Sequence, residues 1–368
     1  MIAFSWRQFR SQGMVGVAGL VVVAVVLAVT GPHLVNVYDT AVAACKASGG
    51  LSSACRNPVG ATYKGLQIAV SALVLVVPAL IGMFWGAPLI AHELETGTFR
   101  LAWTQSVSRR RWLFVKLGLV GLASMVVAGA LSLMANWWAS PLDKVNPDRF
   151  GPANFALHGF VPAGYAVFAF ALAATVGLVM RRTLPAMAVT LAGFIAARLA
   201  VTYWLRPHYM SPVTVHQALT VANAGFELNG PIGQPGTASV VAQTPSLPNA
   251  WVTGANIVDN AGRAPTSAYI KQACPSLVSG GGGPPTGFVK GGALGSVGPG
   301  GGHSPVPGPV QNAFSECFNT LSAKYHAVIT YQPANRFWTF QTIETALFVV
   351  LALALAAGCA WWVRHRVT

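Results

Sequence analysis

Residues 66–90 read "LQIAVSALVLVVPALIGMFWGAPLI", a run without a single Lys, Arg, Asp or Glu. A helix needs about 20 apolar residues to cross the roughly 30 Å hydrocarbon core of a bilayer, so this run predicts a transmembrane helix. Pro78 and Pro88 are expected to kink it. Only 9% of the 368 residues are charged, and soluble domains carry about 25%. The composition therefore favours a membrane protein for the chain as a whole.

Five more runs have the length and composition of membrane spans. With the first, the sequence predicts an all-α membrane protein with six transmembrane helices near 14–30, 66–90, 113–135, 157–180, 184–205 and 344–363. The run at 157–180 is rich in Gly and Ala, which favours close packing against neighbouring helices.

The Lys and Arg residues beside these spans predict the orientation, because cytoplasmic loops carry an excess of them. One side holds Arg7, Arg10, Arg100, Arg109, Arg110, Arg111, Lys116, Arg181, Arg182, Arg364 and Arg366. That side is expected to be cytoplasmic, with both termini. The net charge of +14 thus follows from topology, and the remaining charges form no basic stripe, so nucleic acid is not an expected partner.

The N-terminal segment 1–13, "MIAFSWRQFRSQG", precedes the first span. Ile2, Trp6 and Phe9 fall on one helical face, and Arg7 and Arg10 lie elsewhere. This pattern predicts a short interfacial helix that places Trp6, Arg7 and Arg10 at the membrane surface. The alternative is a basic leader that only sets the topology.

Three domains follow from this pattern. Residues 1–205 hold the first five spans with a cytoplasmic loop at 92–112, and residues 344–368 hold the sixth span and a cytoplasmic tail. Residues 206–343 form a large extracellular loop in which Trp251 and Ile257 are available for a small core. Its Gly/Pro-rich tract at 279–309 cannot bury enough apolar surface to fold, so the loop is expected to be partly disordered.

Four cysteines fall in the two outward-facing loops. Cys45 and Cys55 share the first, and Cys274 and Cys317 flank the Gly/Pro-rich tract in the second. Their placement in an oxidising compartment suggests disulfides. Of the three possible pairings, Cys45–Cys55 with Cys274–Cys317 closes the shortest loops. Four unrelated thiols are the alternative.

The sequence contains no complete motif for catalysis or metal binding among those that we considered. "HELET" at 92–96 lacks the second His of a zinc-protease motif, because that position is Thr96. No phosphate-binding G-x-x-x-x-G-K-[ST] loop and no Ser/His/Asp set is present. We therefore expect no catalytic or metal-binding residues and no ATPase site in this chain.

Two ionisable residues lie in or beside the predicted spans. Arg198 is well inside the fifth span, and Glu344 opens the sixth. A charge in this layer needs a partner or water, so we expect a salt bridge or a shared polar cluster between these two helices. The alternative is that Arg198 extends to the outer head groups. The scarcity of such residues makes an ion-coupled transporter less favoured.

The loop at 92–112 carries several signals of local structure. Gly97 is expected to end the preceding helix, and Ser108 is well placed to cap the next one. Arg109–Arg111 follow in a first helical turn, where the helix dipole disfavours cations. Lipid phosphates or acids on a partner must therefore favour them.

At this point the sequence resembles a known family. "APLIAHELETGTFRLAWTQSVSRRRWLFVKLG" is similar to the cytoplasmic loop of permease subunits of type-2 ATP-binding-cassette (ABC) transporters, above all those of actinobacteria. The residues that carry the pattern are Glu93, Glu95, Gly97, Thr98, Leu101, Thr104, Ser108, Arg109 and Lys116. "RPHYMSP" at 206–212 and "YQPANRFWTFQTIE" at 331–344 resemble the same group. His92 departs from it, because Arg is expected there.

The resemblance implies the function. In that family the loop is a coupling helix that docks onto a separate ATPase subunit, which binds ATP and Mg²⁺, and two permease protomers complete the transporter. It implies an exporter subunit in a bacterial plasma membrane, with a homodimer expected. The coupling residues would be those of the pattern up to Arg109, with Trp103 as an apolar anchor. Arg110, Arg111 and Lys116 would lie at the membrane interface.

Three other classes remain as competitors: a membrane sensor or anchor with a ligand-binding outer loop, an ion-coupled transporter, and an intramembrane enzyme. The substrate is not encoded in a recognisable motif. Tyr165, Phe168, Phe170, Tyr203 and Trp204 are candidates for an apolar path between two protomers. Packing against lipid or neighbouring helices is the alternative for these aromatic residues.

Overall fold

The structure is a computed structural model that describes residues 2–47, 60–97, 109–143, 149–152, 154–219, 224–229, 237–242, 249–274 and 316–365. The chain divides into two compact units. The first unit comprises Met1–Met210 and Asn335–Thr368, and the second comprises Ser211–Ala334.

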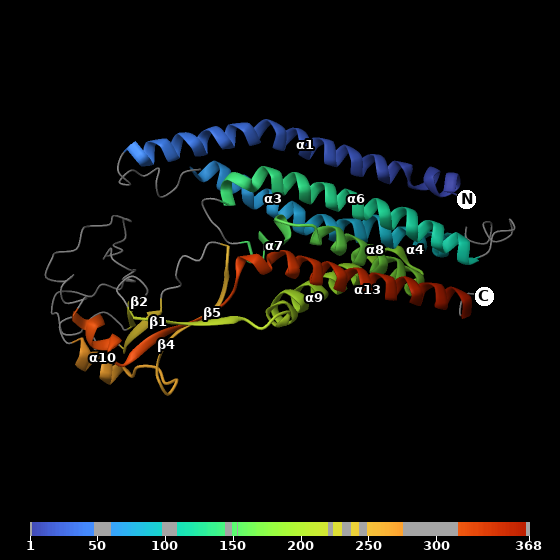
Figure 1. The fold of residues 1–368 in the computed structure, drawn as a ribbon. Helices are drawn as coiled ribbons and strands as arrows, with labels where there is room; N and C mark the ends of the chain where they lie inside the picture. Colours follow the sequence, from blue (N-terminus) through green and yellow to red (C-terminus); the bar gives the residue numbers. More distant parts are fainter. Residues whose placement is uncertain are drawn as a thin grey trace. The chain divides into compact units, whose positions relative to one another are not determined.

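The regular elements described in the first unit are all helical (Figure 1). Its elements are α1 (Ile2–Ala47), α3 (Gly60–Ile81), the π-helical turn η1 (Gly82–Gly86), α4 (Ala87–Thr96), α6 (Arg109–Asp143), α7 (Asn154–Leu157), α8 (Val161–Met180), α9 (Thr183–Ala200), the π-helical turn η2 (Val201–Leu205), the 3-10 turns η3 (Arg206–His208) and η4 (Ala334–Arg336), and α13 (Phe337–His365). Both ends of the chain lie at the same end of this bundle in Figure 1.

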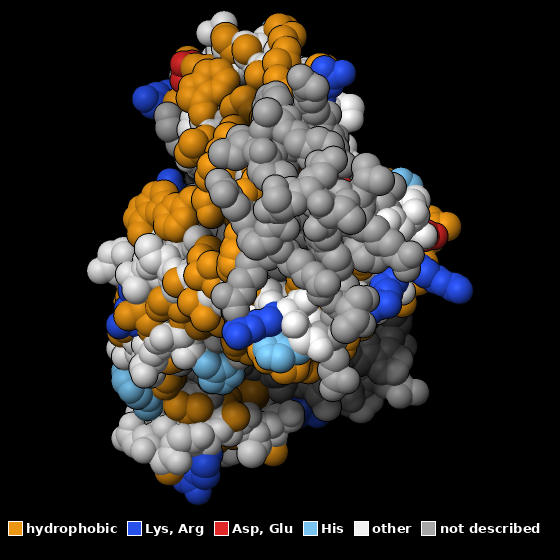
Figure 2. Space-filling model, turned by 90° about the vertical axis from the view of Figure 1, so that its right-hand side faces the viewer, with side chains coloured by type: hydrophobic (Ala, Val, Ile, Leu, Met, Phe, Trp, Pro, Cys, Tyr) orange, Lys and Arg blue, Asp and Glu red, His pale blue; other side chains and the backbone are white. Residues whose placement is uncertain are grey.

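The six predicted spans are confirmed, because six helices in the described residues are long and apolar enough to cross a membrane. Many large apolar side chains on them are exposed, including Val15, Val22 and Leu184. Exposure of this kind suits lipid rather than water. Figure 2 shows hydrophobic side chains along the left side of the view, with Lys and Arg side chains at separate places around it.

Helix α8 is the central helix of the bundle. It contacts α13, α6, η1, α4, α9 and α3. Small residues allow the closest approach: a Cβ added at Gly86 would lie 2.5 Å from Ala173 Cβ, and one added at Gly82 would lie 2.9 Å from Ala169 O. Gly82 and Gly86 form a small-xxx-small pair inside the second span. The close packing expected for 157–180 is therefore confirmed.

Helix α1 differs from the sequence prediction. It runs without interruption from Ile2 to Ala47 and includes Pro32, so the segment 1–13 is the first part of a long helix rather than a separate interfacial one. At about 1.5 Å per residue the helix exceeds the thickness of the hydrocarbon core about twofold. Arg10 is exposed, and the side chains of Trp6 and Arg7 lie outside the described part of the structure.

The second unit contains β-structure, which the sequence analysis did not assign. A three-stranded antiparallel sheet has the order β1-β5-β4, and a separate hairpin pairs β2 with β3. The strands and the helix between them are β1 (Val213–Ala218), β2 (Ala224–Asn229), β3 (Thr237–Ala242), β4 (Trp251–Asp259), α10 (Ser267–Ala273) and β5 (Tyr325–Gln332). A short helix at 316–322 precedes β5.

The core of this unit lies against one face of the sheet. Side chains alternate along β5, with Tyr325, Ala327 and Ile329 buried, as a half-buried strand requires. Tyr325 and Ala327 belong to one core cluster with Ile257 of β4, Ile270 of α10 and Phe318 of the 316–322 helix. The expected burial of Ile257 is confirmed, and Trp251 is half-buried. The tract at 279–309 lies outside the described residues.

Candidate functional site

The end of α4 leads into the predicted coupling loop. Gly97 follows Thr96 with φ 72°, in the left-handed region that favours glycine, and ends the helix. The helix break predicted at Gly97 is therefore confirmed. Thr98, Leu101, Trp103, Thr104 and Ser108 lie outside the described residues. The structure resumes with α6 at Arg109, and the side chains of Arg109, Arg110 and Arg111 are not described either.

Glu93 connects α4 to α6 by an ion pair. Its carboxylate binds the ammonium of Lys116, whose side chain is 2% exposed, and that of Glu93 is 14% exposed. A buried ammonium is tolerated only with a partner of opposite charge. Lys116 is thus held inside the bundle by Glu93 rather than placed at lipid phosphates, which corrects its expected position at the membrane interface.

Glu95 connects α4 to α9 by a helix cap. Its carboxylate accepts hydrogen bonds from the Thr183 hydroxyl (2.7 Å) and from the Thr183 backbone N–H (3.1 Å). Arg182, the N-cap residue of α9, provides no side-chain cap, so Glu95 supplies an acceptor that the free N–H groups of a helix start require. A carboxylate at a helix N-terminus is also favoured by the helix dipole.

These contacts change the role expected for the two acids. Both side chains bind within the chain, Glu93 to Lys116 of α6 and Glu95 to Thr183 of α9. Both residues belong to the last turn of α4, and together they tie this helix end to two other helices. We name this set of four residues, Glu93, Lys116, Glu95 and Thr183, the α4 brace.

A second polar cluster surrounds Glu344. Its carboxylate accepts hydrogen bonds from Arg206 Nε (2.8 Å) and Nη2 (2.9 Å) and from the Tyr165 hydroxyl. Glu344 is 0% exposed and Arg206 is 1% exposed. The Arg206 guanidinium also lies 4.0 Å from the centre of the Phe155 ring. A bidentate Arg–carboxylate pair with an added hydroxyl donor is the arrangement that a buried charge pair needs.

A salt bridge between Arg198 and Glu344 is not formed, but both residues belong to one polar cluster between the fifth and sixth spans, which was the other expected arrangement. Glu344 forms its ion pair with Arg206, and Arg198 reaches the same cluster through Tyr165, with its guanidinium 3.7 Å from the ring centre. Helix α13 begins at Phe337, so Glu344 lies two turns inside the helix rather than at its opening. The cluster holds two guanidinium groups and one carboxylate, and Arg198 Nη1 is buried with no hydrogen-bond partner among the described residues.

The hydrogen bonds that Glu344 accepts are relevant to the alternative that the chain is an ion-coupled transporter. An ion-coupled transporter uses intramembrane carboxylates that can release and rebind a cation or a proton. Both oxygens of Glu344 are engaged by Arg206, and one of them also by Tyr165. The geometry is that of a fixed link between α13 and the end of the fifth span.

A neighbouring amide supports the connection before α8. Gln341, 0% exposed, donates from Nε2 to the Phe155 carbonyl (2.7 Å) and accepts from the Val161 N–H (3.2 Å). Ser132 of α6 donates to the Gly159 carbonyl in the same connection. Buried backbone groups of this non-helical turn thus find side-chain partners, as burial in a membrane requires.

The aromatic residues proposed for an apolar path separate into two groups. Tyr165, Phe168 and Phe170 are at most 6% exposed and belong to the packed interior of the bundle. Tyr203 and Trp204 are 61% and 73% exposed. Such exposed aromatic residues near the end of a span are typical of membrane interfaces.

Comparison with known proteins decides the family. A family model described as "ABC-2 membrane transporter related" matches residues 17–206, just over half of the chain. The chain belongs to this ABC-2-related family. It is therefore a multi-pass membrane protein of the ABC transporter permease type. No curated protein and no solved structure matches it.

The match covers the first five spans of this ABC-2-related chain, including the α4 brace, and ends at Arg206. The second unit and α13 lie beyond it. Glu344, on α13, therefore binds the last residue of the matched region.

The disulfide prediction is confirmed for one pair. Cys274 and Cys317 are bonded to each other, 43 positions apart, and both are buried in the core of the second unit. Cys45 takes part in a disulfide, but Cys55 lies outside the described residues, so the pairing of Cys45 with Cys55 stays a prediction. Cys359 is a buried free thiol in α13.

Sequence reasoning missed three residues of these sites: Thr183, Arg206 and the hydroxyl of Tyr165. Thr183 opens a helix directly after two arginines, which is a weak capping signal. Arg206 directly follows the predicted end of the fifth span, where a cation is usually assigned to topology. Tyr165 was considered only as an aromatic surface, although a buried Tyr hydroxyl generally needs a partner.

Proposed function

We propose that the chain is the membrane-spanning permease subunit of an ATP-driven exporter in a bacterial plasma membrane. A separate ABC ATPase subunit would bind and hydrolyse ATP with Mg²⁺, and this chain would carry no ATPase site of its own. Membership of the ABC-2-related family and six candidate spans support this proposal. A second copy of the chain would complete the transporter, with both termini cytoplasmic.

The α4 brace is the observation that carries the coupling part of the proposal. Transport requires that motion of the ATPase move several helices of the permease together. Glu93 ties the end of α4 to Lys116 on α6, and Glu95 ties it to Thr183 at the start of α9. A push on the 98–108 segment would therefore reach α4, α6 and α9 through short polar links.

This arrangement assigns different tasks to the residues of the coupling loop. Glu93 and Glu95 act as positioning residues, because their side chains bind inside the permease. Contact with the ATPase would fall to the 98–108 segment, with Leu101 and Trp103 as apolar anchors, since aromatic side chains often dominate interfaces. Arg109, Arg110 and Arg111 would stabilise the entry of α6 at lipid phosphates.

The test is purification of the tagged chain from its native membrane, followed by detection of an ABC ATPase and measurement of ATP hydrolysis in the purified complex. Trp103→Ala is expected to lower ATPase association and hydrolysis severalfold while the chain still inserts. The matched control is Arg110→Ala, which should leave association near the wild-type level.

Failure to recover an ATPase with the wild-type chain would contradict the transport proposal and favour a sensor or anchor. Recovery of the ATPase with normal hydrolysis by the Trp103 variant would leave the transporter intact. It would instead refute the assignment of the 98–108 segment as the docking element.

A further inference from the structure

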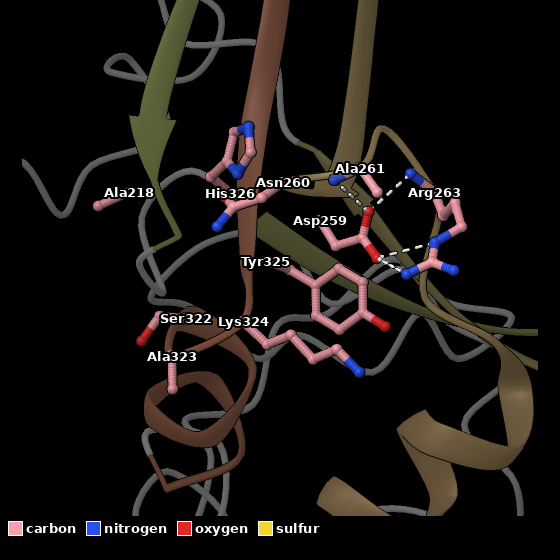
Figure 3. A pocket seen from close by; sticks show the side chains of 10 residues that line it. All are labelled: Ala218, Asp259, Asn260, Ala261, Arg263, Ser322, Ala323, Lys324, Tyr325 and His326. Atoms are coloured by element: carbon pink, nitrogen blue, oxygen red, sulfur yellow. Dashed lines mark hydrogen bonds and ion pairs between the residues drawn. The ribbon is translucent and has the colours of Figure 1, made fainter.

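The second unit contains a pocket at one end of its three-stranded sheet. Strand β1 ends at Ala218, β4 ends at Asp259 and β5 begins at Tyr325, and the register pairs Ala218 with His326 and Asp259 with Tyr325. A pocket of about 490 Å³ opens at this meeting point (Figure 3). Sites for small molecules generally measure about 300–1,000 Å³.

The frame of the pocket is held by the core of the unit. Tyr325 is 6% exposed and packs with Ile257 and Phe318. The 316–322 helix that leads to Ser322 and Lys324 is fixed by the disulfide from Cys317 to Cys274. The lining residues therefore come from strand ends, from the 316–322 helix and from the two turns that adjoin them.

Hydrogen-bond donors dominate the lining. Asn260, Arg263, Ser322, Lys324, Tyr325 and His326 all contribute to it, and Asp259 is the one acidic residue among the described lining residues. Asp259 is already engaged. It accepts hydrogen bonds from the N–H groups of Ala261 and Arg263 (both 2.9 Å) and from Arg263 Nε (3.1 Å), as the dashed lines in Figure 3 show.

These contacts determine the charge of Asp259. The backbone N–H of Arg263 and then that of Ala261, with the Arg263 guanidinium, hold the pKa of Asp259 below its usual value despite partial desolvation. Asp259 is thus a carboxylate at neutral pH, and its charge is balanced by Arg263. Because Asp259 and Arg263 neutralise each other, Asp259 does not balance the charge of the other basic side chain in the described lining.

That cation is Lys324. Its ammonium lies 4.8 Å from the centre of the Tyr269 ring and 5.7 Å from that of Tyr325. Within the residues that the structure describes, its recorded charge contacts are with these rings and not with a carboxylate. Cation–π contacts orient an ammonium without using its N–H groups in strong hydrogen bonds. Lys324 is therefore held at the pocket with donors to offer.

We propose that this pocket binds a small molecule that carries a phosphate or carboxylate group, with Lys324 as the principal contact of the oxyanion. Ser322, His326 and Asn260 also contribute to the lining and could donate further hydrogen bonds to the ligand. The pocket volume of about 490 Å³ is many times the roughly 30 Å³ that one water occupies in the liquid, so an organic group fits beside the oxyanion. This site is independent of ATP and of any ATPase partner.

The test uses the full chain in nanodiscs of phosphatidylcholine, without ATP. Glycerol 3-phosphate is the probe and glycerol its neutral counterpart, and binding is measured by calorimetry. The wild-type chain should bind the phosphate ester and not glycerol. Lys324→Gln should weaken binding by about tenfold or more, as the loss of a charge-assisted hydrogen bond implies.

Lys271→Gln is the matched control, because Lys271 is exposed on α10 of the same unit and is not part of the lining. It should bind like the wild type. Competition by phosphatidylglycerol in the same nanodisc would identify a lipid head group as the source of the oxyanion, and its absence a soluble molecule. Equal binding of glycerol and glycerol 3-phosphate, or equal loss in both lysine variants, would overturn the proposal.

Discussion

Glu95 at the end of the second span accepts two hydrogen bonds from Thr183, 88 positions later in the chain, at the start of the fifth span. Caps usually come from the residue just before the helix. Here the cap comes from another helix, so the start of α9 and the end of α4 are joined at the edge of the 98–108 segment. Any movement of one must strain or break these bonds.

Thr183→Val should therefore weaken the link between α9 and α4 without disturbing the core, because only the backbone N–H bond to Glu95 remains. The valine keeps the volume but removes the hydroxyl donor to Glu95. We expect faster hydrogen exchange at the first amides of α9 and a severalfold fall in transport-linked ATP hydrolysis. Thr183→Ser retains the hydroxyl and should behave like the wild type. Unchanged hydrogen exchange in the valine variant would show that the Thr183 hydroxyl does not hold the start of α9 in place.

Glu93→Gln should destabilise the first unit strongly. The substitution leaves the buried ammonium of Lys116 without its carboxylate, and breaking a buried ion pair in this way costs about 3–5 kcal/mol. The double variant Glu93→Leu/Lys116→Leu removes both charges and should recover most of the loss. Reversible unfolding in bicelles would measure the three stabilities. A double variant as unstable as Glu93→Gln alone would contradict a pairwise explanation.

The sequence predicted the six spans well because each is a long apolar run, a signal that depends on local composition alone. The α4 brace and the Glu344 cluster could not be derived in the same way. The pairs Glu93–Lys116 and Arg206–Glu344 join helices that only the packing brings together. The nearest candidate by sequence pattern was Arg198, but the turn of α9 into η2 and η3 brings Arg206 to Glu344 instead.

The strands of the second unit were missed for a different reason. β5 reads "YHAVITYQ", a clear alternation of half-buried and buried residues. It is a single short strand between a Gly/Pro-rich tract and a membrane span, and the strands that it pairs with lie more than 60 positions away in the chain.

Loss of the Cys274–Cys317 disulfide should destabilise the second unit selectively. The bond spans 43 positions, and the chain-entropy relation gives about 4 kcal/mol for a closed loop of that length. Cys274→Ser/Cys317→Ser is expected to lower the unfolding temperature of this unit and to increase its proteolysis, while the helical unit retains its stability. Equal protease resistance with and without reductant would contradict this expectation.

The two arginines of the Glu344 cluster offer a direct test of its charge balance. Arg206 neutralises Glu344 through two hydrogen bonds, and Arg198 is the second cation, with Nη1 buried and unpartnered among the described residues. Arg206→Met should cost about 3–5 kcal/mol, because a buried carboxylate is left without its cation. Arg198→Met removes an unsatisfied donor, which ordinarily costs about 1–3 kcal/mol, and should be neutral or stabilising. The same substitution at two positions controls for side-chain size, and unfolding in bicelles gives both values. If Arg198→Met proves as damaging as Arg206→Met, Arg198 must neutralise Glu344 as well, and the cluster would share its single carboxylate between both cations.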